Sequence, residues 1–198
     1  MGTSAFRIKC IDRSERSRRR EWLAALRAFD PKSAQVLKLD GLVGVYRTNM
    51  LGRDVVLKRW DIVRPWARLR SVVRTTRAFR HWRTAKWILD EFHRENLFTA
   101  RCFALIVESG RGMRREWLVM EALPGKTVLQ HLADRDLSVK QEHYVAWMLG
   151  WQAVLLFHRK LYNNDPKPSN MIVTDVDADP PAIAAIDCVG IKSRLWID

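Results

Sequence analysis

The sequence contains few cysteines and no long hydrophobic run. Its three cysteines, Cys10, Cys102 and Cys188, are far apart and form no C-x-x-C pair. That pattern argues against a disulfide scaffold or a structural zinc site and fits a reducing compartment. No apolar run approaches the ~20 residues of a membrane-spanning helix, and the polar, Arg-rich first 20 residues lack the apolar core of a secretory signal. We therefore expect a cytoplasmic protein, with a peripheral position on a membrane as a further option.

Positive charge is abundant instead. The chain has 35 Lys and Arg against 22 Asp and Glu, which gives a formal charge of +13 over 198 residues. Such a balance favours an anionic partner: a nucleotide, a phosphorylated glycolipid, an acidic membrane surface or nucleic acid. Hydrophobic residues make up 47% of the chain, so it can build the core of one domain or of two small lobes.

The first half of the sequence alternates between helical and strand patterns. A basic amphipathic helix is predicted over 13–29, with Trp22 and Leu26 on its apolar side. It either packs on the domain or lies on anionic lipid. A second basic helical stretch, 64–95, carries arginines over 64–83 that form a solvated face or hold the phosphates of a glycolipid. Short β-branched segments bounded by glycine turns predict strands at 34–39, 43–48, 54–60, 103–108 and 117–122.

The character changes after residues 123–125. A short helix over 127–133 and a long one beginning at Ser138 precede a polar loop at 163–170, and two short strands follow at 171–174 and 182–187. The predicted fold class is therefore α+β, with two lobes around a cleft. The expected domains are a basic helical extension (1–33), an N-lobe of antiparallel sheet plus helix (34–123) and a short C-lobe (124–198).

The polar loop carries the strongest chemical signal. Asp165 is followed five residues later by Asn170, directly after a long apolar helix, which matches the D-x-x-x-x-N catalytic loop of kinases. Asp165 would accept the proton of an attacking hydroxyl, and Asn170 would reach a metal on the nucleotide phosphates. Lys167 would neutralise charge on the transferred phosphoryl group. The alternative is a plain turn rich in Asn, Asp and Pro.

Two further residues fit the same order. Asp187 ends an apolar strand, where a kinase keeps its main Mg²⁺ ligand, although an Asp there is also ordinary turn chemistry. Lys58 closes the strand Val55-Val56-Leu57, as in the V-A-I-K pattern whose Lys pairs with the α and β phosphates. A surface lysine would look the same. The order of strand Lys, long helix, catalytic loop and strand Asp favours the kinase interpretation.

From these motifs the chain resembles the lipopolysaccharide kinase family, the Kdo and heptose kinases within the protein-kinase-like superfamily. The resemblance runs from about residue 37 to the end of the chain and includes the segment 156–170 and the pair Ile186-Asp187. It implies ATP and Mg²⁺ as cofactors, with Asn170 and Asp187 as metal ligands. It also implies a hinge at 119–125, where Glu121 and Leu123 bind adenine, and a phosphate loop containing Gly41 and Gly44.

The sequence departs from that family at several positions. Asn163 replaces the usual His of the loop, and Gly41 and Gly44 are the only glycines of the phosphate loop. The helix register puts His81 where a Glu should orient Lys58, with Glu91 or Glu95 as substitutes. Only 11 residues follow Asp187, so no A-P-E motif is present in this sequence.

We therefore expect transfer of the ATP γ-phosphoryl group to a sugar hydroxyl of a lipopolysaccharide-like acceptor, in the cytoplasm or on the cytoplasmic face of the inner membrane. An atypical Ser/Thr protein kinase would use the same site. A pseudokinase would bind nucleotide or a partner without turnover. Nucleic-acid binding is motivated by charge alone.

Overall fold

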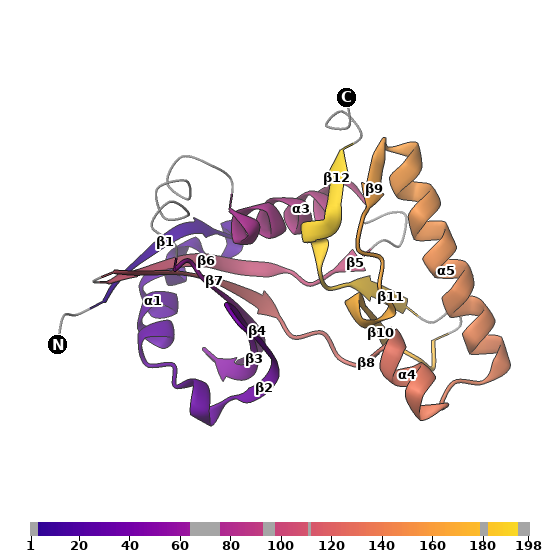
Figure 1. Cartoon of the computed structure of the whole chain (residues 1–198), viewed down its shortest axis with the longest axis horizontal. Coiled ribbons are helices and arrows are strands. Elements are labelled where there is room, and N and C mark those ends of the chain that lie inside the picture. The colour runs from indigo at the N-terminus through magenta and orange to yellow at the C-terminus, as the bar shows by residue number, and fades with distance from the viewer. Residues whose placement is uncertain (1–3, 64–75, 93–97, 111, 179–181, 194–198) are drawn as a thin grey trace. The chain divides into compact units, whose positions relative to one another are not determined.

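The computed structural model describes residues 4–63, 76–92, 98–110, 112–178 and 182–193 (Figure 1). The chain divides into two compact units, Met1–Trp82 with Arg101–Ala122 and Arg83–Ala100 with Leu123–Asp198. Each unit is therefore built from two separate stretches of sequence. The predicted basic helix over 64–95 is described as α3 (Arg77–Glu91), and its arginines between 64 and 75 lie outside the described residues.

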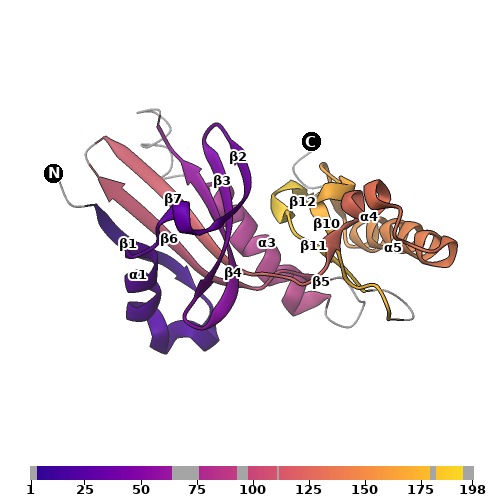
Figure 2. The same ribbon diagram turned by 90° about the horizontal axis from the view of Figure 1, so that it is seen from below.

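A six-stranded antiparallel sheet forms the first unit, in the order β1-β6-β7-β4-β3-β2 (Figure 2). Tight turns with positive φ at Gly41 and at Leu51-Gly52 join β2, β3 and β4. The predicted three-stranded meander and the two later strands are confirmed. The bounds are β1 Ala5–Ile11, β2 Gln35–Asp40, β3 Val43–Met50, β4 Arg53–Asp61, β6 Cys102–Gly110 and β7 Met113–Glu121.

The N-terminal region differs from the predicted helical extension, because it begins with a strand. Strand β1 pairs antiparallel with β6. The alternation of apolar Phe6, Ile8 and Cys10 with charged residues is the period-two signal for it. The 3₁₀ helix η1 (Arg13–Arg18) and the helix α1 (Arg19–Arg27) follow, then the short η2 (Pro31–Ser33).

Helix α1 packs on the first unit, as one of the two predicted alternatives states. Its Trp22 and Leu26 are buried in a cluster with Val55, Leu57 and Val119 of the sheet. The Trp22 ring also stacks on Phe103, with 5.6 Å between ring centroids. The apolar face of α1 is therefore used inside the unit.

The second unit combines α4, α5 and the part of α3 from Arg83 onward with small sheets. Its core joins the α5 residues Val145 and Met148 to Met171, Val173 and Ile183 of the strands. One sheet has the order β5-β11-β10-β8, and β9 pairs with β12. The bounds are β5 Phe98–Thr99, β8 Lys126–Thr127, α4 Val128–Asp134, α5 Val139–His158, β9 Leu161–Asn163, η3 Pro168–Asn170, β10 Met171–Asp175, β11 Ala182–Ala185, η4 Cys188–Gly190 and β12 Ile191–Ser193.

Helices α4 and α5 each begin with a capping box. Thr127 caps α4 with Gln130, and Ser138 caps α5 with Gln141, each pair satisfying backbone N–H groups in the first turn. The predicted capping box at Ser138 is thus confirmed. Over the described ranges, no helix is both long and apolar enough to cross a bilayer.

Candidate active site

The loop between β9 and β10 is folded by its own hydrogen bonds. The Asp165 N–H donates to Asn163 Oδ1 at 3.0 Å. Further along, the Lys167 N–H donates to the Asp165 carbonyl at 2.9 Å, and the Asn170 N–H donates to the Lys167 carbonyl at 2.8 Å. Because Pro166 and Pro168 fix φ and offer no N–H, the chain between these bonds has few alternative conformations. The loop therefore holds Asp165 at a defined position.

Asn170 is joined directly to Asp165. Its Nδ2 donates to the Asp165 carbonyl at 3.1 Å and to Asp165 Oδ2 at 3.3 Å. The five-residue spacing seen in the sequence thus becomes a side-by-side pair of carboxylate and amide. Since the amide nitrogen faces Asp165, the amide oxygen of Asn170 is directed away from that carboxylate.

Lys167 lies on the other oxygen of Asp165. Its Nζ is 2.7 Å from Asp165 Oδ1, and both side chains are exposed. The hydrogen bond to Asp165 raises the pKa of Lys167, and the charge of Asp187 adds a smaller effect in the same direction. The ammonium group thus lies within the electrostatic influence of both acids.

Asp187 follows β11 and begins η4. The N–H of the preceding residue, Ile186, donates to the Asn170 carbonyl at 2.9 Å, which ties the end of β11 to the end of the loop. Asp187 Oδ1 accepts from the Val189 N–H at 3.3 Å. Asp165, Lys167, Asn170 and Asp187 therefore belong to one hydrogen-bonded region of the second unit.

The donor set suits magnesium bound together with a nucleotide. Within the described ranges, no group of three or more His, Cys, Asp and Glu side chains gathers as a self-contained metal site. Mg²⁺ in phosphoryl-transfer sites typically takes one or two carboxylates and completes its shell with phosphate and water oxygens. The Asp187 carboxylate and the Asn170 amide oxygen are donors of this kind, and the backbone hydrogen bond from Ile186 to Asn170 joins the two segments that carry them.

Gly190 of η4 packs against the loop residues 163–165, a contact that the sequence did not predict. A Cβ added there would lie 2.7 Å from Asn163 Oδ1, 2.9 Å from Asn164 Oδ1 and 3.3 Å from Asp165 Cβ. The Asn164 N–H donates to the Gly190 carbonyl at 3.1 Å. Glycine is therefore required for η4 to approach the loop this closely.

Thr99 is a second supporting residue that the sequence analysis missed. It comes from β5, which runs parallel to β11. Its Oγ1 donates to the Ala185 carbonyl at 2.6 Å and lies 3.1 Å from Cys188 Sγ, and both side chains are buried. These contacts fix the chain on either side of Asp187. A lone threonine 88 positions earlier gives no sequence signal for such a contact.

Lys58 belongs to the first unit, in the middle of its sheet. It pairs with Leu118 of β7 and with Val45 of β3, and its Nζ lies 5.4 Å from the centre of the Trp60 ring. The distance is within the range of a cation–π contact. The side chain is half-buried on the face of β4 opposite the Val55 and Leu57 core.

His81 of α3 reaches this same face. It is fully buried, and its ring centroid lies 6.4 Å from that of Trp60, two residues beyond Lys58. The helix position predicted to carry a Glu thus carries His81, beside the lysine strand. Glu91 is exposed at the last residue of α3, and Glu95 lies outside the described residues.

The remaining predicted residues lie at strand ends or turns. Gly41 has a φ of 51° in the β2–β3 turn, and Gly44 provides space for the Tyr46 ring, 2.7 Å from where its Cβ would be. The Glu121 N–H, at the end of β7, donates to the Arg101 carbonyl at 2.8 Å. Leu123 is the first residue of the second unit on this crossing.

Comparison with known proteins gives the fold. No protein-family profile matches the sequence, and no curated protein matches it significantly. Among solved structures, "WaaP in complex with acyl carrier protein" is similar to this chain with a TM-score of 0.54 at 16% sequence identity, over 95% of this chain and 73% of that one. The predicted fold class is thereby confirmed as α+β and protein-kinase-like.

Proposed function

We propose that the protein is an ATP-dependent phosphotransferase that acts on a sugar hydroxyl of a lipopolysaccharide-core-like acceptor. The observation that carries this proposal is the linked arrangement of Asp165, Asn170 and Asp187 in one hydrogen-bonded region, with Lys167 on the Asp165 carboxylate. A kinase needs a hydroxyl-orienting carboxylate next to the metal ligands, since its catalysis is mostly positioning and charge neutralisation.

In this proposal each residue has a separate task. Asp165 accepts a hydrogen bond from the acceptor hydroxyl and takes its proton as the oxygen attacks the γ-phosphorus; the bond from that phosphorus to the β–γ bridging oxygen breaks, and ADP leaves. Lys167, already 2.7 Å from Asp165, moves onto the phosphoryl oxygens and neutralises their charge. Asn170 and Asp187 hold magnesium, which when bound neutralises the phosphates. Lys58 holds the α and β phosphates, Gly41 and Gly44 cover them, and the chain at Glu121 and Leu123 binds adenine.

The choice of acceptor rests on two supports. The resemblance of the loop and of the Ile186-Asp187 pair to lipopolysaccharide kinases favours a sugar hydroxyl. The charge of +13 favours an acceptor that carries phosphates. A peptide hydroxyl would fit the same chemistry, so an acceptor screen must include peptides.

A second candidate, a pseudokinase, is favoured by His81. In active kinases a helix Glu orients the strand lysine, and here the corresponding position carries a buried histidine beside Trp60. A lysine oriented less firmly would still bind nucleotide while transferring phosphate slowly.

The decisive experiment measures ATP turnover with Mg²⁺ and a lipopolysaccharide core extract, and nucleotide binding by calorimetry. We expect Asp165→Asn to lower turnover by about 10²–10⁴-fold while ATP still binds, because a general base is removed. Asp187→Asn should weaken the Mg²⁺-dependent part of ATP binding. Asp177→Asn, an exposed aspartate in the β10–β11 turn, is the matched control and should behave like the wild type.

Three results separate the hypotheses. Acceptor-dependent turnover that is lost in Asp165→Asn and kept in the control supports the kinase. Nucleotide binding without turnover on glycolipid, oligosaccharide or peptide acceptors supports the pseudokinase. The absence of Mg²⁺-dependent ATP binding in the wild type contradicts both.

A further inference from the structure

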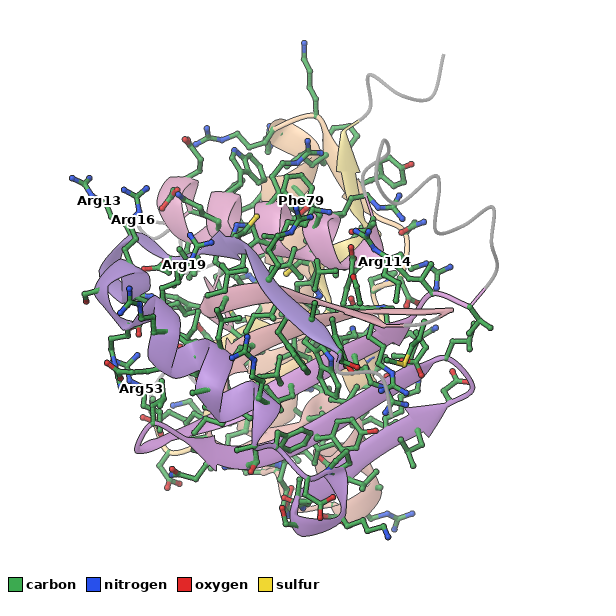
Figure 3. All side chains as sticks on the ribbon, turned by 90° about the vertical axis from the view of Figure 1, so that its left-hand side faces the viewer. Arg13, Arg16, Arg19, Arg53, Phe79 and Arg114 are labelled. Carbon is green, nitrogen blue, oxygen red and sulfur yellow. The ribbon has the colours of Figure 1, made fainter. Side chains whose placement is uncertain are left out.

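Three arginines form a row along η1 and the start of α1. Arg13, Arg16 and Arg19 are all exposed and follow one another at intervals of three residues. A 3₁₀ helix has three residues per turn, so side chains at i and i+3 lie above one another, about 6 Å apart along the axis. Figure 3 shows the three side chains in succession along this edge of the first unit, with Arg53 below them.

The acids near this row are already paired with other arginines. Glu15 is buried and contacts Arg53 at 2.8 Å, while Asp12 contacts Arg101 at 2.8 Å. Burial alone would raise the pKa of both carboxyls, but the hydrogen bonds they accept, including those from Arg53 and Arg101, lower it instead. Both acids are therefore ionised at neutral pH and paired with Arg53 and Arg101 rather than with the row.

The row itself has no such compensation. Across the described ranges, Arg13, Arg16 and Arg19 make no ion pair or hydrogen bond through their side chains. Neighbouring Arg18, by contrast, donates to Glu21 at 2.9 Å. Arg18 is thus paired with an acid, whereas the guanidinium groups of Arg13, Arg16 and Arg19 are available to bind an anion.

The surroundings of the row indicate which anion. The apolar residues of α1, Trp22 and Leu26, are buried against the sheet, so the element cannot insert into acyl chains. Single-stranded nucleic acid would need exposed aromatic rings for its bases, yet the Trp22 ring is fully buried and stacked on Phe103. A layer of lipid phosphates requires no exposed apolar face and no exposed aromatic rings, because guanidinium groups bind phosphate oxygens directly.

We propose that Arg13, Arg16 and Arg19 dock the protein on the phosphates of an anionic membrane surface. The biological use rests on the proposed function, since a kinase of lipopolysaccharide-like acceptors meets its substrate at a membrane. The docking is electrostatic and lies at headgroup level. Each Arg near an anionic surface strengthens binding about fivefold, so the row contributes about two orders of magnitude.

The test is co-sedimentation of the full chain with vesicles of phosphatidylcholine containing 30% phosphatidylglycerol, and with phosphatidylcholine alone. The variant Arg13→Gln/Arg16→Gln/Arg19→Gln is compared with Arg83→Gln/Lys86→Gln/Lys140→Gln, which removes the same charge from exposed positions elsewhere. We expect the row variant to lose about 100-fold in partitioning onto anionic vesicles and the control variant to lose less than tenfold. Binding of the wild type should fall steeply between 0.05 and 0.5 M NaCl.

Equal losses in the two variants would overturn the proposal, because net charge rather than the row would then explain the binding. Unchanged vesicle binding of the row variant, with lost binding to a 30-nucleotide single strand, would overturn it in favour of nucleic acid. Circular dichroism checks that both variants are folded.

Phosphotransfer is measured in parallel on a delipidated core oligosaccharide and on acceptor embedded in vesicles. The row variant should keep the first activity and lose most of the second. A wild type inactive on both acceptors contradicts the proposed function alone, whereas the vesicle result still decides the docking surface.

Discussion

Gly190→Ala tests whether the close contact between η4 and the loop sets the position of Asp165. The new Cβ would lie below 3.0 Å from two oxygens, those of Asn163 and Asn164, a separation that real Cβ atoms essentially never show. Asn163 Oδ1 also accepts the Asp165 N–H, so it cannot move without weakening that hydrogen bond. The strain must therefore be relieved by moving the loop away from η4.

The expected size follows from these contacts. Overpacking of this kind costs about 1–3 kcal/mol of stability, and one weakened hydrogen bond contributes about 1 kcal/mol of that. A displacement of a reacting group by about 1 Å lowers turnover about 10²-fold. We therefore expect kcat to fall roughly 10- to 100-fold while the Kd for ATP changes little.

Gly150→Ala is the matched control, because Gly150 lies exposed in the middle of α5 with nothing within 4 Å of its added Cβ. Alanine there should stabilise the protein by about 0.5–1 kcal/mol. Urea denaturation of both variants measures the change in the free energy of unfolding, and steady-state kinetics measures the change in kcat. If Gly190→Ala is as stable and as active as Gly150→Ala, the contact between η4 and the loop does not position Asp165.

Three further outcomes are expected. Gly125→Ala should lower the free energy of unfolding by about 3 kcal/mol or more, because φ is 91° and the new Cβ would overlap the Val173 carbonyl. Gly52→Ala is the control: φ is 76° but the space around it is open, so it should cost about 1–2 kcal/mol. Equal losses of the two variants in urea denaturation would refute the overlap at Gly125. Glu15→Gln removes the ion pair with Arg53 and should cost about 1–3 kcal/mol. Folding lowers the pKa of Glu15. The carboxylate therefore contributes to the stability of the fold above the unfolded pKa of about 4.3, and this contribution is lost as the pH falls through the folded pKa. Because Glu15→Gln lacks this carboxylate, urea denaturation should show a shallower loss of its stability in acid than for the wild type. Ser138→Ala should cost about 1 kcal/mol, with circular dichroism showing earlier melting; no change would mean that the capping box is dispensable.

Local chemistry explains which parts of the structure could be predicted. The hairpins of the first unit follow from glycines at turns between β-branched segments, and Ser138 marks the start of α5 with its own side chain. The loop motif brought Asp165 and Asn170 together because their spacing acts within six consecutive residues. Such signals need no knowledge of distant contacts.

The parts that were missed depend on partners far along the chain. Strand β1 has a period-two pattern, but the arginines that follow it favoured a helical interpretation, and only pairing with β6 makes the strand stable. Thr99 and Gly190 matter because of what β11 and the loop bring beside them. Neither residue carries a local signal of that contact.

The interleaving of the two units has a consequence for synthesis on the ribosome. Ala5 pairs with Ser109, so the first sheet waits for about a hundred further residues before its edge strand has a partner, a long-range contact that slows folding. Meanwhile β5 must wait for β11, near the end of the chain. A chain that ends after Ala122 contains every residue of the first unit, but its residues 83–100 lack the rest of the second unit. A nascent chain therefore carries β1 unpaired until β6 has been made, and β5 unpaired until β11 has been made. Producing either unit as a separate protein requires a circular permutation or a designed linker, because a single truncation cannot remove the inserted stretch that belongs to the other unit.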